Sequence, residues 1–257
     1  MNLKIEKLYN QKSTNNSTTN FKKESCFLRI MIKEKSLKFI QKVLWNYNKW
    51  TLTSLLQKPN FAKIYEEIAL KERVTTLNVN DLHNVYTITL ATKKIRGDIA
   101  EVGVYRGSSA KVICKVKENR ILHLFDTFEG LPETDSIDFK YDGVHKFKKG
   151  DFSASFNEVK KYLKKYKNVY FYKGIFPETS KPINNKKFSF VHFDVDIYRS
   201  AKDCLEFFYP RMSKGGVILS HDFPVGKGVV KAFEEFFKDK PETFIPLLDK
   251  HVMVVKL

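Results

Sequence analysis

The order of apolar and polar residues predicts that strands and helices alternate through most of the chain. Short apolar runs typical of buried strands recur at 98–104, 121–126, 169–173, 188–194 and 216–221. Between these runs, apolar residues recur at helical spacing at about 108–118, 155–166, 199–209 and 228–238. This alternation is typical of a parallel sheet covered by helices on both faces.

The last part of the chain predicts one reversal of strand direction. Two further apolar runs cover 243–248 and 251–256, and only Asp249 and Lys250 separate them. A link this short cannot hold a helical crossover, so the two strands must be antiparallel. We therefore predict an α/β fold: a Rossmann-like, mostly parallel seven-stranded sheet with one antiparallel strand near the C-terminus and extra N-terminal helices.

The region before the alternating segment has a different pattern. Residues 10–20 are polar and of low complexity, which predicts disorder or a loop. Helical spacing follows at 34–57 and 61–73, and Asn80 or Asp81 could cap a further helix that runs to about Lys94. We predict an N-terminal extension over residues 1–60, partly disordered and then helical, and an α/β domain over 61–257. The 34–57 helix is expected to pack on protein, although peripheral membrane contact stays possible.

Composition narrows the classes of partner. The 257 residues carry a formal charge of +17, mostly from lysine. This charge favours anionic partners, but solvated lysine faces would explain it equally well, and no motif for specific nucleic-acid binding accompanies it. The three cysteines form no CxxC pair, the N-terminus lacks the apolar core of a signal peptide, and no apolar run approaches the ~20 residues of a membrane span. We predict a cytoplasmic protein.

A glycine turn follows the first strand of the α/β domain. Glu101, Gly103 and Gly107 form the pattern E-x-G-x-x-x-G, in which the glycines allow a tight turn and close approach of a ligand. Ser108 and Ser109 open the next helix, where free N–H groups and hydroxyls could face a carboxylate or phosphate.

The second strand of the domain ends in an acid. Asp126 lies about twenty residues beyond the glycine turn, where carboxylates commonly accept hydrogen bonds from ribose hydroxyls. The turn and Asp126 together predict a site for a nucleoside-containing cofactor.

Acidic residues gather at the ends of two later strands. Asp194 ends the run at 188–194, and Asp196 falls in the loop after it. Asp222, preceded by His221, marks the end of the following strand. Neighbouring parallel strands end at the same sheet edge, so these carboxylates should converge, which is costly unless a cation joins them. A divalent ion held by oxygen ligands would resolve the repulsion.

Five ordered motifs resemble the macrocin O-methyltransferase (TylF/MycF-like) family. They cover 101–107, 126–133, 173–179, 192–198 and 209–216, and the resemblance extends over about residues 75–257. It implies the class I fold of S-adenosylmethionine-dependent methyltransferases and transfer of a methyl group to a hydroxyl of a sugar with a divalent metal. We predict that this sugar is nucleotide-linked or part of a glycan or glycoside, and that the protein forms a homodimer or a higher homo-oligomer.

The resemblance also assigns roles to individual residues. The glycine-turn residues would hold the methionine end of the cofactor, Asp126 the ribose, and Gly174 and Ile175 would lie near the adenine. The full expected cofactor set is Glu101, Gly103, Arg106, Gly107, Ser108, Ser109, Asp126, Gly174, Ile175 and Asp194. Asp196 would be the general base, and Asp194, His221 and Asp222 the metal ligands.

One position departs from the family pattern of two consecutive aspartates. His221 replaces the first of them, and imidazole suits softer divalent ions than Mg²⁺. The metal could therefore be Mg²⁺ or Mn²⁺, or be absent, and His221 could assist proton removal. Two alternatives stay open: a catechol- or small-phenol-type O-methyltransferase, and a catalytically inactive S-adenosylmethionine-binding homologue.

Overall fold

A computed structural model describes residues 59–72, 74–139 and 146–257. The chain divides into two compact units, residues 1–59 and 60–257, and the second is described below. The predictions for residues 10–20 and 34–57 lie outside the described residues. The proposed role of 1–60 as a separate extension stays a prediction.

The second unit is built on one seven-stranded sheet with the order β3-β2-β1-β4-β5-β7-β6. The first five strands are parallel neighbours, β7 runs antiparallel to β5, and β6 pairs antiparallel with β7. The predicted fold class is thereby confirmed. The strands are β1 (Asp98–Val102), β2 (Leu122–Asp126), β3 (Val169–Lys173), β4 (Phe188–Phe193), β5 (Met212–Ser220), β6 (Ile245–Pro246) and β7 (Val252–Val255).

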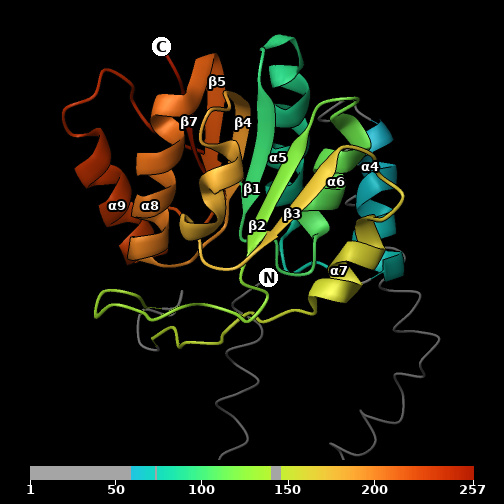
Figure 1. The fold of residues 1–257 in the computed structure, drawn as a ribbon, viewed down its shortest axis with the longest axis horizontal. Helices are drawn as coiled ribbons and strands as arrows, with labels where there is room; N and C mark the ends of the chain where they lie inside the picture. Colours follow the sequence, from blue (N-terminus) through green and yellow to red (C-terminus); the bar gives the residue numbers. More distant parts are fainter. Residues whose placement is uncertain (1–58, 73, 140–145) are drawn as a thin grey trace, which may run out of the picture. The chain divides into compact units, whose positions relative to one another are not determined.

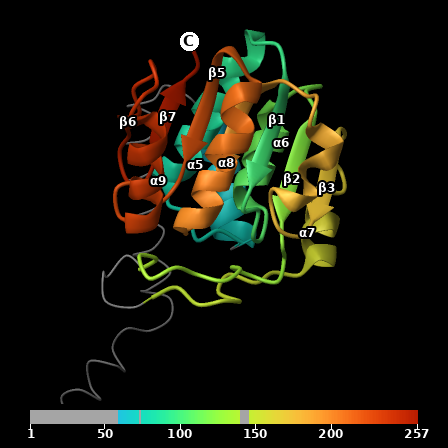
Figure 2. The same cartoon turned by 60° about the vertical axis from the view of Figure 1, so that its left-hand side comes forward.

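Helices cover both faces of the sheet (Figures 1 and 2). On one face α5 (Val79–Ala91) packs on α6 (Ser108–Val116), and on the other α8 (Tyr198–Phe208) packs on α9 (Lys227–Phe237). The remaining helical elements are α4 (Pro59–Tyr65), η1 (Glu66–Glu72), η2 (Thr92–Lys94), α7 (Phe156–Leu163), η3 (Glu178–Ile183) and η4 (Tyr209–Arg211). Every helix among the described residues is too short or too polar to cross a membrane.

The alternating apolar runs form the core as expected. β4 is buried at all six positions, because helices cover it on both faces and strands flank it on both sides. Phenylalanines dominate the layer between the sheet and α8–α9: Phe188 packs edge-on against Phe208, and Phe193 stacks on Phe233. This rigid layer fixes the carboxyl ends of β4 and β5, where the acidic residues lie.

Several element boundaries differ from the sequence prediction. The N-terminal cap of α5 is Asn78, not Asn80 or Asp81. The Asn78 side chain accepts from the amides of Asn80 and Asp81, and the Asp81 carboxylate accepts from the Asn78 amide. The predicted helix over 61–73 is α4 followed by the π-helical η1, and β5 begins at Met212, four residues before its predicted start. The C-terminal hairpin is shorter than predicted, since β6 holds only two residues.

A long segment between β2 and α7 lies at the carboxyl ends of the strands (Figure 1, green to yellow below the sheet). Backbone hydrogen bonds join its two halves: the Leu131 amide donates to the Asp151 carbonyl, and the Gly150 amide donates to the Leu131 carbonyl. The buried Asp138 carboxylate attaches it to the body of the domain by accepting from the Tyr198 amide at 2.8 Å. The described parts of this segment, residues 127–139 and 146–155, therefore form a wall beside the strand ends and are called the wall segment below.

Candidate active site

A cavity of about 320 Å³ lies at the carboxyl ends of β1, β2 and β4, within the size range of small-molecule sites. Seven of the predicted site residues line it: Gly103, Asp126, Gly174, Ile175, Asp194, Asp196 and His221. The wall segment contributes Thr127, Gly130, Leu131, Pro132, Asp151 and Phe152. The topology thus brings together these residues from six separate stretches of sequence.

The glycine turn fits tightly against the end of β4. Gly103 has φ +83°, and a Cβ built on it would lie 1.8 Å from the carbonyl oxygen of Asp194. Only glycine can occupy this position without moving the backbone. Gly107, with φ +83°, sits just before the first residue of α6.

Asp126 holds the turn in place. One of its carboxylate oxygens accepts hydrogen bonds from the amides of Val104 and Tyr105, each at 2.7 Å, and the other accepts from the Phe128 amide at 2.6 Å. Burial nevertheless raises the pKa of Asp126 above its ordinary value, against the effect of these three donors. The carboxylate lines the cavity, so it can meet a ligand hydroxyl while it anchors the turn.

The other predicted cofactor residues lie away from the cavity lining. Glu101 is fully buried within the sheet and meets the Nδ1 atom of His192 at 2.8 Å. Arg106 is exposed, with its guanidinium carbon 5.1 Å from the centre of the Tyr105 ring. Ser108 and Ser109 are buried in the first turn of α6. Cofactor contacts by this group, together with Gly107, stay predictions.

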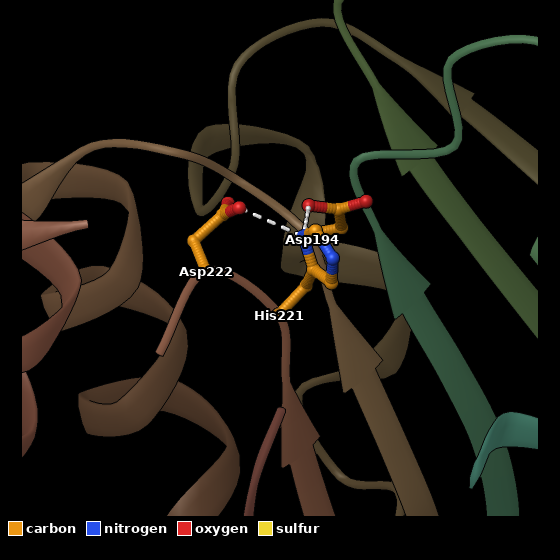
Figure 3. Close-up of side chains that lie close together, drawn as sticks. All are labelled: Asp194, His221 and Asp222. Carbon is orange, nitrogen blue, oxygen red and sulfur yellow. Dashed lines mark ion pairs between the residues drawn. The ribbon is translucent and has the colours of Figure 1, made fainter. Parts of the chain in front are cut away.

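The predicted metal ligands converge (Figure 3). Nδ1 of His221 lies 3.0 Å from Oδ1 of Asp194 and 2.7 Å from Oδ1 of Asp222. Asp194 follows β4, and His221 and Asp222 follow β5. One donor atom from each residue lies within 4.8 Å of the other two. Asp222 adopts φ +68°, a conformation that costs a non-glycine residue ~1–3 kcal/mol.

The charges of the three residues are strongly linked. Burial alone would lower the pKa of His221, but the carboxylates of Asp194 and Asp222 raise it far above its ordinary value. Burial likewise opposes ionisation of Asp194, yet His221 lowers the pKa of that carboxyl to about 2. The cluster therefore favours a positive charge between two carboxylates, whether an imidazolium or a metal ion supplies it.

The donor set fits a divalent ion. Nδ1 of His221 is buried and faces two carboxylate oxygens at close range, yet it makes no hydrogen bond of good geometry to either. The three donor atoms lie close enough together for one ion to contact all of them. Two carboxylate oxygens and one imidazole nitrogen suit Mn²⁺ or a softer ion better than Mg²⁺.

Asp196 lies in a tight turn at the cavity wall. It has φ +60°, and the Ile197 amide donates to the Val195 carbonyl at 2.6 Å across it. Its side chain lines the cavity and the residue is only 8% exposed. Asp196 therefore lies in a turn and not in the extended strand, and it lines the same cavity as Asp194.

Sequence reasoning missed several residues at the cavity. Asp81 lines it and was interpreted only as a possible helix cap, while Lys250 was assigned to a hairpin link. Thr76, Leu77 and Asn78, just before α5, also line it. The capping pattern around Asn78 gave a local signal for the helix start, but nothing local to these residues showed that this end of α5 meets the end of β5.

Comparison with known proteins identifies the family. A model of the macrocin O-methyltransferase (TylF) family matches residues 59–251. The chain belongs to this family. Among solved structures, the O-methyltransferase NovP has a TM-score of 0.62 at 20% identity and covers 81% of this chain and 99% of its own. The calicheamicin methyltransferase CalS11 has a TM-score of 0.60 at 17% identity, covering 87% of this chain and 93% of its own. The fold is that of class I methyltransferases.

Two curated relatives are named as O-methyltransferases, and the name of the first includes a rhamnosyl group. The chain is 26% identical over 148 residues to the 8-demethyl-8-(2,3-dimethoxy-alpha-L-rhamnosyl)-tetracenomycin-C 4'-O-methyltransferase of Streptomyces olivaceus, covering 53% of this chain and 57% of that one. It is 28% identical over 142 residues to the mycinamicin III 3''-O-methyltransferase of Micromonospora griseorubida, covering 50% and 56%. The chain thus spans little more than half the length of these relatives.

Proposed function

We propose that this chain is an S-adenosylmethionine-dependent O-methyltransferase whose acceptor is a sugar hydroxyl. The observation that carries the proposal is one cavity that joins the glycine turn and Asp126 to the cluster of Asp194, His221 and Asp222. Membership of the macrocin O-methyltransferase family supports the reaction, and the rhamnosyl group in the name of the first relative supports the acceptor class.

The proposed cofactor site uses the end of the cavity formed by β1, β2 and β3. Gly103 lets the turn lie directly against the end of β4, the Asp126 carboxylate can accept from ribose hydroxyls, and Gly174 with Ile175 borders the space beyond β3. When bound, S-adenosylmethionine supplies a methyl group already activated by its sulfonium centre. The protein then mainly has to hold the acceptor oxygen in line with that methyl group at about 3 Å.

At the acceptor end of the proposed site, the acceptor hydroxyl must lose its proton. A sugar hydroxyl is a poor nucleophile, and Asp196 is the carboxylate we assign to remove its proton during transfer, a role worth ~10²–10⁴-fold in rate. Asp194, His221 and Asp222 would hold the divalent ion, which when bound lowers the pKa of a hydroxyl beside it. Holding that ion also offsets the repulsion between the two carboxylates.

The function is tested with purified protein, S-adenosylmethionine and a panel of acceptors. The panel contains nucleotide-linked deoxysugars, rhamnosides and, as a competing class, catechols. Mass spectrometry should detect a methylated sugar, and periodate sensitivity locates the modified hydroxyl. Methylation of catechols alone would replace the sugar assignment, and cofactor binding without turnover of any acceptor would favour an inactive homologue.

The base is tested by a matched pair of substitutions. Asp196→Asn keeps the size of the side chain but cannot take a proton, so kcat should fall ~10²-fold or more while affinity for S-adenosylmethionine is nearly unchanged. His221→Asn should lower kcat less if His221 only binds metal, and its loss should be partly offset by higher metal concentration. The opposite order of effects would make His221 the base.

A further inference from the structure

Behind the three proposed metal ligands lies a layer of buried polar side chains that the proposed mechanism does not use. Asp81, from the first turn of α5, is 2% exposed, and His251, just before β7, is fully buried. His192 on β4 and its partner Glu101 on β1 are also fully buried. Buried polar groups in such number require a reason, because each costs free energy unless it is paired.

Asp81 connects this layer to the cluster. Its Oδ2 atom lies 3.6 Å from Nε2 of His221, and its Oδ1 atom lies 3.4 Å from Nδ1 of His251. Since Nδ1 of His221 faces Asp194 and Asp222, the two nitrogens of this ring face carboxylates on opposite sides. A ring flip would remove Nδ1 from the two ligand carboxylates.

His251 limits the motion of the His221 ring from a second side. The two rings meet edge-to-face with centroids 5.1 Å apart, and the His251 ring lies 5.7 Å from that of His192. His192 is in turn held by Glu101 at 2.8 Å. On the side away from Asp194 and Asp222, the His221 imidazole is therefore in contact with the Asp81 carboxylate and the His251 ring.

We propose that Asp81 is a positioning residue that fixes the orientation of the His221 ring, so that Nδ1 stays aimed at the Asp194–Asp222 pair. The part of this inference that concerns metal affinity rests on the proposed function. A carboxylate on the far nitrogen of a ligating histidine sets the ring and raises its basicity, and loss of such a partner typically costs ~10–100-fold in metal affinity.

The same carboxylate links the cluster to the cavity wall. Oδ2 of Asp81 also accepts the Asn78 amide at 3.1 Å, which completes the capping box of α5. Thr76, Leu77 and Asn78 line the cavity directly before that helix. In this proposal one side chain sets both the start of α5 and the orientation of the His221 ring.

The ring is observed directly by long-range ¹H–¹⁵N NMR of imidazole nitrogens in the full chain, without added metal. The chain has six histidines, and His221→Gln identifies the His221 signals by their loss. Asp81→Asn keeps size and can still accept the Asn78 amide, so α5 should stay capped. We expect the ¹⁵N signals of His221 to shift or broaden in Asp81→Asn as the ring samples other orientations.

Asp98→Asn is the matched control. Asp98 pairs with the buried His123 at 3.0 Å, but it lies at the opposite end of β1 from the cavity. This variant should change the signals of His123 and leave those of His221 in place. His221 signals that are unchanged in Asp81→Asn, while the control shifts those of His123, would overturn the proposal.

Metal affinity gives a second readout. Titration of Mn²⁺ followed by electron paramagnetic resonance should show at least ~10-fold weaker binding by Asp81→Asn and unchanged binding by Asp98→Asn. If the unaltered protein binds no Mn²⁺, the proposed metal role fails, whereas the NMR result still decides the role of Asp81. If Asp81→Asn does not fold, Asp81→Ser, whose hydroxyl can also accept the Asn78 amide, takes its place in both measurements.

Discussion

Gly103 offers a direct test of how closely the cofactor turn and the acid cluster depend on each other. Replacement by alanine introduces two separate costs. The first is the backbone: an L-residue at φ +83° pays ~1–2 kcal/mol that glycine does not. The second is steric, because the new Cβ would lie 1.8 Å from the Asp194 carbonyl oxygen, whereas real Cβ contacts are essentially never closer than 3.0 Å.

The steric cost falls on the site itself. To relieve the contact, the end of β1 and the start of the loop after β4 must separate by more than about 1 Å. Asp194 is a proposed metal ligand and Gly103 lines the proposed cofactor site, so both move together. A displacement of ~1 Å in a reacting geometry can cost ~10²-fold in rate. The overpacking adds ~1–3 kcal/mol of lost stability to the backbone cost.

Substitution of Gly215 by alanine separates the backbone cost from the steric cost. Gly215 has φ +78°, close to that of Gly103, but its Cβ would meet only the Ile95 side chain at 3.5 Å, an ordinary contact. It lies in the first half of β5, away from the cavity lining. Gly215→Ala should therefore lose ~1–2 kcal/mol of stability and keep its activity.

We would compare Gly103→Ala and Gly215→Ala in three measurements: stability by chemical denaturation, affinity for S-adenosylmethionine by calorimetry, and the rate of methyl transfer. Gly103→Ala should be ~1–3 kcal/mol less stable than Gly215→Ala, bind S-adenosylmethionine more weakly and turn over ~10²-fold more slowly. Equal stability and equal cofactor affinity in the two variants would refute the reasoning, since the close contact with Asp194 would then carry no functional consequence.

Three further outcomes are expected. Asp126→Ala should weaken S-adenosylmethionine binding by ~1–3 kcal/mol in calorimetry, because it loses charge-assisted bonds and releases the amides of Val104 and Tyr105; unchanged affinity would remove Asp126 from the site. Activity should fall in EDTA and return with Mn²⁺ at least as well as with Mg²⁺, because an imidazole replaces one carboxylate; full activity in EDTA would end the metal proposal. Burial opposes ionisation of Glu242, but hydrogen bonds from Lys256 and Tyr209 lower the pKa of this carboxyl to about 2. The ionised Glu242 carboxylate therefore stabilises the fold fully above pH ~4.5, and this stabilisation is lost as the pH falls towards 2. Acid-induced unfolding of Glu242→Gln should therefore depend less on pH in this window, and an unchanged profile would contradict this role.

The sheet and the edge that carries the site could be predicted because their signals are local. β4 is fully buried and four of its six residues are apolar, which gave a clear strand signal despite Ser189 and His192. The link around Asp249 is too short for a parallel crossover. The convergence of Asp194 with His221 and Asp222 also follows from strand order, because parallel neighbours end at one edge. Boundaries were less accurate where tertiary contacts decide them, as at the start of β5.

The contacts behind the cluster could not be predicted for a physical reason. Asp81 precedes the sheet in sequence, and its position relative to His221 depends on how α5 packs on the domain, which periodicity does not specify. The local pattern around Asn78 and Asp81 is fully explained as a capping box, so it carries no sign of a second role. His251 likewise lies at the start of an ordinary strand. When a residue has both a local structural role and a contact with a distant part of the chain, the sequence around it shows only the local role. The charge of Asp81 becomes informative only when the fold places it beside the two buried histidines, His221 and His251.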